Sequence, residues 1–510
     1  MALTRNHPML HNHTIVGLIR RRFTLTTGSG ESRTSDGGRW IMGRRERMKD
    51  HSRIAASLFW AMVVVVAMPL LTLHVYAQEA TEHSSSPPTE PHNHTRSLSH
   101  QETKQLNQAT EEWLSVGGEI RLRWEGRRHA GFRSGNDDGY LLTRFRFHLD
   151  VHPGEWFRVY VEGQDAQALG LAGGPDPPVF QDTFDLRQAY IDLFHRQKRG
   201  LGLRLGRQEL IFGEERLIGA FNWGNTARTF DAVRVYYDTK AIRLDAFAAA
   251  VVRIQDERFN RTAKGDNLYG VYAAFPRWIP RGRWEVYTLW RAQSQTVNER
   301  GERGDADRVT FGTRLVGKLP HNFDYGVELA GQAGDVAGDR ARAWAAHLQL
   351  GYTLARVRLK PRFLAEYNFA SGDDDPNDGK VGTFDQLFPT NHNKYGIADL
   401  VGWRNIHNLR LGLSLKPVDR VGLNVDVHSF WLASRRDALY NAPGRPVARI
   451  LDGAVSRHVG EEIDLYGSIK LTPYFSLGAG AAHVFAGRFL KQATPGENTS
   501  FAYAMASYHF

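Results

Sequence analysis

The segment Arg144-Phe145-Arg146-Phe147-His148-Leu149-Asp150-Val151 alternates strictly between polar and apolar side chains. Successive side chains of a β-strand point to opposite faces, so the two Phe, the Leu and the Val share one face. Both Arg, the His and the Asp share the other. The segment therefore predicts a strand whose two faces meet different environments. A soluble sandwich would show the same alternation, so one strand alone leaves the fold open.

The same pattern recurs in segments of about ten residues along the rest of the chain, with no competing helical period. Arg356-Val357-Arg358-Leu359-Lys360-Pro361-Arg362-Phe363 is a second clear instance, with four cations on its polar face. We predict 18 strands, at residues 115–125, 140–151, 157–166, 186–194, 201–209, 232–237, 242–252, 268–275, 284–293, 308–316, 323–331, 343–352, 357–368, 405–416, 421–431, 462–471, 475–485 and 501–510.

The connections between these segments decide the fold, because they alternate between short turns and long loops. Short ones contain turn-forming residues, as in His152-Pro153-Gly154 and Thr472-Pro473-Tyr474. The long ones cover residues 167–185, 210–231, 369–404 and 432–461. An even strand number with this rhythm is typical of an outer-membrane barrel. We therefore predict an all-β fold, a transmembrane antiparallel β-barrel of about 18 strands with short periplasmic turns and long extracellular loops.

The N-terminal part of the chain does not share the alternation. Residues 54–73 are almost uninterruptedly apolar, follow Lys49 and Arg53, and precede Ala77. This layout predicts a signal peptide at residues 48–77 in which translation starts at Met48, although a single membrane anchor has a similar length. Residues 1–47 would then be a mis-assigned N-terminal extension. Residues 78–111 are polar and lack an apolar period, which predicts a disordered periplasmic leader before a barrel at residues 112–510.

The charge balance gives no support for a nucleic-acid partner. The chain has a formal net charge of +10, but most of that excess precedes Gln78. The remainder contains 54 Lys and Arg against 51 Asp and Glu. The absence of cysteine suits an oxidising compartment. The terminal Phe510, with Tyr508 on the same face, resembles the signal recognised by the barrel-assembly machinery of the Gram-negative outer membrane, where we expect the protein to lie.

The apolar face of each strand must meet lipid. Strict alternation therefore predicts which side chains form the inner wall of the barrel. The expected inward cations are Arg121, Arg123, Arg144, Arg146, Arg158, Arg204, Arg234, Arg243, Arg314, Arg356, Arg358, Lys360, Arg362, Arg410, Lys416 and Lys470. The expected inward anions are Glu119, Asp150, Glu162, Asp192, Asp245, Glu328, Glu366, Asp426, Glu462 and Asp464.

This arginine excess suggests a conduit for an anionic solute. About 18 strands enclose more space than wall side chains can fill, which leaves room for water, a plug or folded-in loops. Planar guanidinium groups bind carboxylates through two parallel hydrogen bonds. For any one residue, an ion pair that merely stiffens the wall is the alternative. For the set, we expect a role in selectivity.

Three stretches resemble the alginate-export porin family. They are Leu186–Asp192 with Gly206–Glu209, Phe221–Trp223 and Phe230–Arg234; Phe384–His392 with Asn408–Arg410; and Gly460–Asp464 running to Phe485. The resemblance implies a monomeric 18-stranded outer-membrane channel with an electropositive constriction that passes alginate, an acidic polysaccharide. From the matched motifs and the inventory, the candidate conduit residues are Arg144, Arg146, Asp192, Arg207, Glu209, Arg234, Arg358, Arg362 and Arg410. Arg207 lies on the face of Leu203 and Leu205, so its inward placement requires a bulge or the start of a loop fold.

Other functions remain open at this point. A general anion-selective porin for small organic acids and a sealed structural barrel are alternatives. A barrel-embedded hydrolase is another, but adjacent carboxylates such as Glu461 and Glu462 point to opposite faces of a strand, and no catalytic motif is present. We expect no enzyme activity and no cofactor. The Asp373-Asp374-Asp375 loop with Asp378 is a calcium candidate against the alternative of a solvated loop. Expected partners are an acidic polysaccharide or other organic anion, outer-membrane lipid and periplasmic polysaccharide-export proteins.

Overall fold

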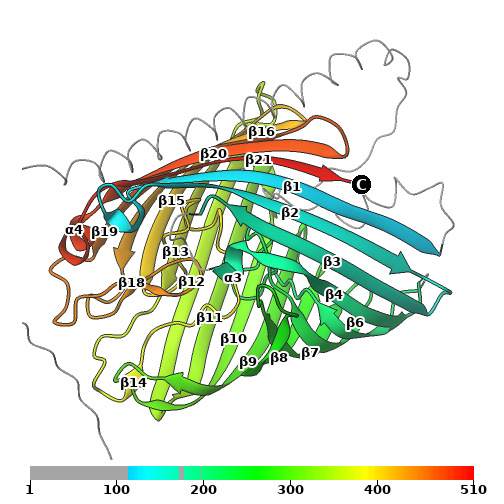
Figure 1. Cartoon of the computed structure of the whole chain (residues 1–510), viewed down its shortest axis with the longest axis horizontal. Helices are drawn as coiled ribbons and strands as arrows, with labels where there is room; N and C mark the ends of the chain where they lie inside the picture. The colour runs from blue at the N-terminus through cyan, green and yellow to red at the C-terminus, as the bar shows by residue number, and fades with distance from the viewer. Residues whose placement is uncertain (1–112, 172–176, 197) are drawn as a thin grey trace, which may run out of the picture. The chain divides into compact units, whose positions relative to one another are not determined.

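The computed structural model describes residues 113–510 except residues 172–176 and 197. The expected extension, signal peptide and periplasmic leader lie outside these residues. Eighteen antiparallel strands form a closed barrel in which the last strand pairs with the first (Figure 1). They are β1 Leu114–Arg128, β2 Asp138–Val151, β3 Phe157–Leu169, β4 Asp182–Phe194, β5 Leu201–Gln208, β6 Phe230–Asp238, β7 Arg243–Arg253, β8 Arg261–Phe275, β9 Gly282–Val297, β10 Arg303–Leu319, β11 Phe323–Val336, β12 Asp339–Thr353, β13 Arg362–Ala370, β15 Ile406–Val418, β16 Val421–Leu432, β19 His458–Lys470, β20 Phe475–Ala486 and β21 Thr499–His509.

Each predicted strand overlaps one of these eighteen, so the predicted fold class is confirmed. The remaining elements lie in the connections. They are the short strands β14 Lys380–Val381, β17 Leu439–Tyr440 and β18 Pro446–Ala448, the helices α3 Pro177–Phe180 and α4 Arg488–Ala493, and the 3-10 turns η2 Ala130–Phe132 and η3 Pro320–Asn322. Within residues 113–510, gaps excepted, no helix is long and apolar enough to cross a bilayer.

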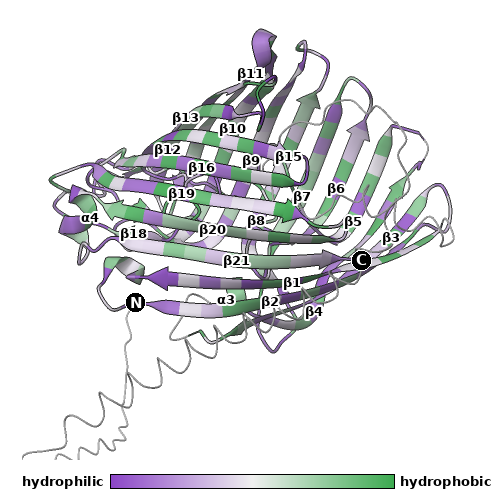
Figure 2. Cartoon of the chain, turned by 90° about the horizontal axis from the view of Figure 1, so that it is seen from above, coloured by the Kyte–Doolittle hydropathy of each residue, from purple (hydrophilic) through white to green (hydrophobic). Residues whose placement is uncertain are grey.

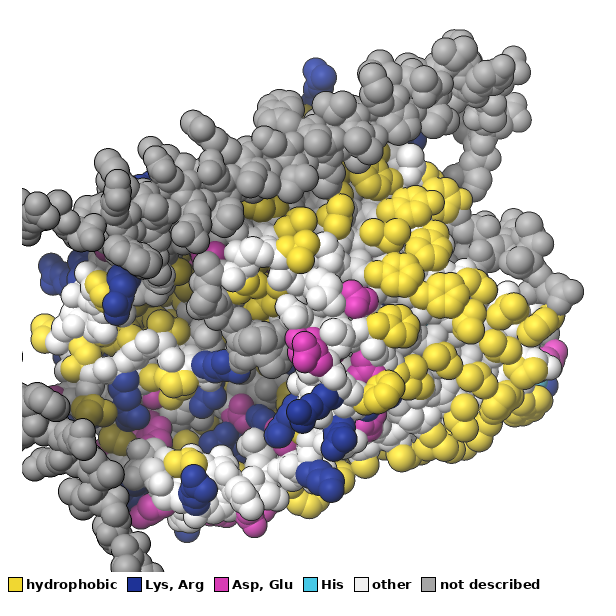
Figure 3. Space-filling view, in the orientation of Figure 1, with side chains coloured by type: hydrophobic (Ala, Val, Ile, Leu, Met, Phe, Trp, Pro, Cys, Tyr) yellow, Lys and Arg dark blue, Asp and Glu magenta, His cyan; other side chains and the backbone are white. Residues whose placement is uncertain are grey.

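The two faces of the strands divide as the alternation predicts. On β2, Phe145 and Phe147 are about two-fifths exposed on the outside, whereas Arg144 and Arg146 are buried inside. Figure 2 shows the same alternation of hydrophilic and hydrophobic positions along neighbouring strands. In Figure 3, hydrophobic side chains cover much of the wall toward the end where the C-terminus lies. Charged side chains gather toward the opposite end. The outside therefore carries an apolar surface suited to lipid.

The turn before β13 differs from the prediction. The alternating stretch from Arg356 onward is not strand until Arg362, because residues 354–361 form a turn closed by the hydrogen bond from Leu354 N to Pro361 O (2.9 Å). Leu359 (φ 74°) and Lys360 (φ 41°) adopt left-handed backbone conformations that end regular pairing. The predicted strand at 357–361 is therefore wrong.

Interior packing comes largely from long connections rather than from the wall alone. Two of them fold into the barrel, and we call residues 209–229, between β5 and β6, the first inward loop. Residues 371–405, between β13 and β15, form the second inward loop. Trp403 is fully buried on the second inward loop. Leu210, Ile218 and Phe384 are also fully buried and belong to the same apolar cluster.

Leu411 and Val357 are similarly exposed, but Leu411 faces lipid from a strand whereas Val357 lies in a turn. Leu411 lies in the middle of β15 and is 55% exposed, while Val357 is 49% exposed in the turn before β13. We expect Leu411→Arg to lower the free energy of unfolding in lipid vesicles by about 2–4 kcal/mol, the cost of a cation at mid-membrane depth. Val357→Arg should change it little. Urea titration of both variants measures the difference, and equal effects would contradict the assignment of the faces.

Candidate functional site

The inner wall is charged, as expected, but its charges are more nearly balanced than the sequence suggested. All ten expected inward anions are buried. Arg356, Arg358 and Lys360 leave the cation set, because they lie exposed in the turn before β13. Two buried carboxylates that the parity analysis missed, Glu125 and Glu285, join the anions. The wall is therefore an arginine–carboxylate lattice with a smaller cation excess.

Most candidate conduit residues are inside the barrel, and each of these is paired. Arg144 donates two hydrogen bonds to Glu119 (2.7 and 2.8 Å), and Arg146 donates to Gln164 (2.7 Å). Asp192 accepts from Arg158 and Arg204, and Glu209 from Arg187.

The remaining candidate cations inside the barrel are also paired with carboxylates. Arg234 pairs with Asp245 (2.8 Å), and Arg362 donates to Asp324 from Nη2 (2.5 Å) and Nε (2.9 Å). Arg410 bridges two carboxylates, Glu366 (3.1 Å) and Asp426 (2.8 Å). For these individual residues, the structure therefore shows the ion pairs that were the alternative to a conduit role.

Two candidates are not where a conduit role requires them. Arg358 is exposed in a turn. Arg207 pairs with Asp231 (2.8 Å) and donates to Asn260 O (3.2 Å) at the end of β5. Neither a bulge nor the start of a loop fold turns it inward, because Arg207 and Asp231 are register partners on the face opposite Arg204 and Arg234. The inward placement of both arginines is wrong.

The tip of the first inward loop lies against an arginine cluster on β1 and β2. Asn222 O accepts from Arg121 and Arg144 (both 3.0 Å), Trp223 O from Arg123 (2.5 Å), and Gly224 O from Arg144 (3.2 Å). Here neutral backbone carbonyl groups accept hydrogen bonds from guanidinium groups that could equally bind carboxylates.

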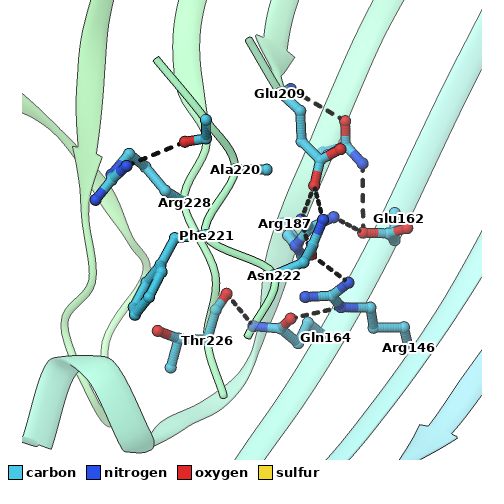
Figure 4. A network of polar contacts seen from close by, with 12 residues as sticks. Arg146, Glu162, Gln164, Arg187, Glu209, Ala220, Phe221, Asn222, Thr226 and Arg228 are labelled. Carbon is cyan, nitrogen blue, oxygen red and sulfur yellow. Dashed lines mark hydrogen bonds and ion pairs between the residues drawn. The ribbon is translucent and has the colours of Figure 1, made fainter. Parts of the chain in front are cut away.

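The side chain of Asn222 connects this tip to a second set of charges (Figure 4). Its oxygen accepts from Arg146 (3.1 Å) and Arg187 (3.3 Å), and its nitrogen donates to Glu209 (3.2 Å). Arg187 also pairs with Glu162. Sequence parity missed Arg187, because the register of β3 against β4 shifts after Glu162.

The base of the first inward loop is tied to the other side of the barrel. Arg216 donates to Glu366 (2.9 Å) on β13 and to Tyr395 Oη (2.9 Å) in the second inward loop. Glu214 accepts from Arg314 (2.8 Å) on β10. The loop therefore crosses the lumen and is anchored by charges at both ends. Its sequence carries no strand period, so no pattern placed Arg216 at the site.

The second inward loop is anchored beside the first and pairs with it. Ile218 and Phe388 form an isolated parallel bridge between the loops, and the rings of Trp223 and His392 stack at 3.6 Å. Asp385 accepts from Arg291 (3.1 Å) and Arg308 (3.2 Å) on the wall. Burial alone would raise the pKa of Asp385, but these two guanidinium groups hold it well below its usual range.

Lys394, in the same loop, shows the cost of burying a charge at this site. Burial lowers the pKa of Lys394 to about 8, with Arg216 contributing in the same direction and Glu215 opposing it. The calcium candidates are engaged locally. Asp373 accepts from the backbone N of Asp375 (2.9 Å) and Gly382 (2.6 Å). In the part of the chain that the structure describes, no group of His, Asp or Glu side chains is arranged to hold a metal ion.

A closed 18-strand barrel with an apolar outside, a charged lumen and inward-folded loops defines an outer-membrane channel of the porin type. The chain belongs to the alginate export family, whose model matches residues 112–503. The protein is thus a channel of the Gram-negative outer membrane rather than an enzyme.

Solved outer-membrane proteins share the fold at low sequence identity. Pseudomonas aeruginosa OpdO is 12% identical with a TM-score of 0.53, over 78% of this chain and 97% of that chain. Acinetobacter baumannii OccAB2 is 11% identical with a TM-score of 0.54, over 78% and 98%. Pseudomonas aeruginosa OpdK with vanillate is 12% identical with a TM-score of 0.52, over 78% and 98%. No curated protein matches the chain.

Arg216 is the residue whose loss should release the first inward loop. We expect Arg216→Met to weaken docking of this loop by about 3–5 kcal/mol, because one partner of a buried ion pair is removed. Limited proteolysis of the refolded protein should then cut within residues 209–229 while the barrel stays intact. Arg435→Met, at an exposed loop position, is the matched control. Unchanged proteolysis of the Arg216 variant would show that other contacts hold the loop.

Proposed function

We propose that this channel passes an anionic solute, and that an alginate-like acidic polysaccharide exported across the outer membrane is its substrate. The proposal rests on the arginine cluster at the tip of the first inward loop. Arg121, Arg123, Arg144 and Arg146 have Glu119 and Glu125 as their carboxylate partners, and further donors go to neutral oxygens. This part of the lumen therefore keeps a local surplus of positive charge.

Unused donors in the same cluster support a ligand rather than pure wall stiffening. Arg121 Nε, Arg144 Nε and Arg146 Nη2 are buried and have no hydrogen-bond acceptor. A buried donor without an acceptor costs free energy, which a carboxylate would recover. Carboxylates repeated along a polymer could be passed from one guanidinium group to the next. The alternating Asp and Glu of the wall would limit trapping at any single site.

A small organic acid is the second candidate substrate. The two inward loops are tied to the wall and to each other, so a polymer requires more of the lumen to open than a small anion does. OpdK, whose structure includes the aromatic carboxylate vanillate, has the same fold at low identity. Fold similarity at this level does not identify a substrate. It does make aromatic acids the appropriate small anions to compare with an acidic polysaccharide.

The arginine cluster should set the ion selectivity of the open channel. We expect reversal potentials in planar bilayers to show anion preference. Arg121→Gln combined with Arg146→Gln should lower the anion-to-cation permeability ratio by about fivefold, equivalent to about 1 kcal/mol of charge interaction. Arg356→Gln with Arg358→Gln, in the exposed turn before β13, is the control and should have a much smaller effect. Cation preference in the unmodified channel would contradict the proposal.

Current block separates the two substrates. An oligouronate should block the unmodified channel at lower concentration than an aromatic monocarboxylate, because several carboxylates meet several guanidinium groups. The Arg121 and Arg146 variant should lose this difference. Stronger block by the aromatic acid would favour the small-solute function.

A further inference from the structure

The inward face of β19 carries a carboxyl pair unlike the rest of the wall. Glu462 and Asp464 are two residues apart on one face and are 0% and 1% exposed. In the described part of the chain, neither forms an ion pair with Lys or Arg. The nearest cationic candidate is His428 Nε2, 3.6 Å from Asp464 Oδ2. Most of the wall carboxylates described above pair with arginine, so two adjacent ones without an arginine partner need another explanation.

Both carboxyl groups hold the second inward loop. Glu462 Oε1 accepts from Ala398 N (2.9 Å), and Asp464 Oδ2 accepts from Ile397 N (3.2 Å). Gly396 (φ 89°) brings the backbone so close that a Cβ there would lie 2.3 Å from the Glu462 carboxyl. Arg127 of β1 donates to Ala398 O (3.1 Å), which fixes this segment from the other side. The pair thus anchors residues 396–398 to the wall.

The remaining oxygens of the pair have no hydrogen-bond partner. Glu462 Oε2 and Asp464 Oδ1 are buried and have no donor when both groups are ionised. The other oxygen of each group binds the backbone N of Ala398 or Ile397, and because these residues are consecutive, the two carboxyl groups are held close together. A hydrogen bond between two carboxyl groups requires a proton on one of them, whereas two buried carboxylates without a cation would repel.

We propose that Glu462 and Asp464 form a proton-binding site, in which one shared proton latches the second inward loop to β19. This site is separate from the arginine cluster and goes beyond the proposed anion transport. Loss of the proton leaves two negative charges close together and weakens the anchor of residues 396–398. The docked state binds one proton more than the undocked state, so docking is favoured at low pH and lost as pH rises.

Charged groups on several elements surround this proton. His428 and Asp426 of β16 lie at the positions paired with Glu462 and Asp464, and Arg410 of β15 is paired with His428. Neighbouring β20 contributes the apolar Ala482 and Val484 at the paired positions. The titratable or charged groups around the pair and the segment that it anchors include Asp426 and His428 on β16, Arg410 on β15, Tyr466 on β19, Tyr503 on β21, Arg127 on β1, and His392 and Asp399 on the loop.

The test uses the cysteine-free chain with a single thiol in the latched segment. Ala398→Cys is buried while the loop is docked, so its reaction with a methanethiosulfonate reagent reports undocking. Glu462→Gln keeps the acceptor for Ala398 N and supplies an amide donor to Asp464, which imitates the protonated pair permanently. Comparing A398C with A398C/E462Q at each pH cancels the ionisation of the thiol itself.

We expect the ratio of labelling rates, A398C over A398C/E462Q, to rise by about tenfold per pH unit above the dissociation of one linked proton. Glu461→Gln is the matched control, since Glu461 is the adjacent outward residue and pairs with His458 (2.6 Å). A398C/E461Q should keep the full pH dependence. A flat ratio, or its loss in the Glu461 variant as well, would overturn the proposal.

Two further measurements keep the result interpretable. Asp464→Asn supplies an amide donor to Glu462 and should abolish the pH dependence as Glu462→Gln does, which covers a failure of one variant to fold. Reversal potentials of the Glu462→Gln channel report anion preference independently of labelling. Anion preference without a pH-dependent ratio would therefore reject the latch alone, and a pH-dependent ratio without anion preference would reject the proposed transport alone.

Discussion

Hydrocarbon outside the barrel is the constraint on which the rest of the structure depends. A strand whose outer face meets lipid must turn its charges inward, and a closed barrel must satisfy its backbone groups between strands. The pairing of β1 with β21 removes the last free edge. Most charged side chains of the strands are thereby confined to one interior, where unpaired charges are costly. The arginine–carboxylate lattice follows from this confinement before any transport role is considered.

The width of the barrel creates a second requirement. Wall side chains of 18 strands cannot fill the interior, so other groups must occupy it. The two inward loops supply apolar side chains such as Phe384 and Trp403, and also further partners for charges of the wall. Arg216 reaches Glu366, and Asp385 reaches Arg291 and Arg308. The loops and the wall therefore stabilise each other as the layers of a soluble core do.

The alternation of apolar and polar residues made the barrel predictable, because in every strand successive side chains face lipid and lumen in turn. It succeeded for all ten expected inward anions and for Arg144 and Arg146. It failed where strand geometry ends, since Arg358 continues the alternating letters through a turn. The family motifs also misled at Arg207, whose face had already disagreed with an inward position. Arg216 and Asn222 lie on a loop without a period, so only tertiary structure could bring them to the wall.

The contacts between the loops bear on how the lumen can change. Trp223 at the arginine cluster stacks on His392, four residues before the segment held by Glu462 and Asp464. Ile218 and Phe388 join the same loops at a second point. Moving one loop alone would break both contacts and expose apolar rings, whereas moving the loops together keeps them. A solute that displaces carbonyl groups from the arginine cluster must therefore work against the anchors of both loops, including those on the opposite wall.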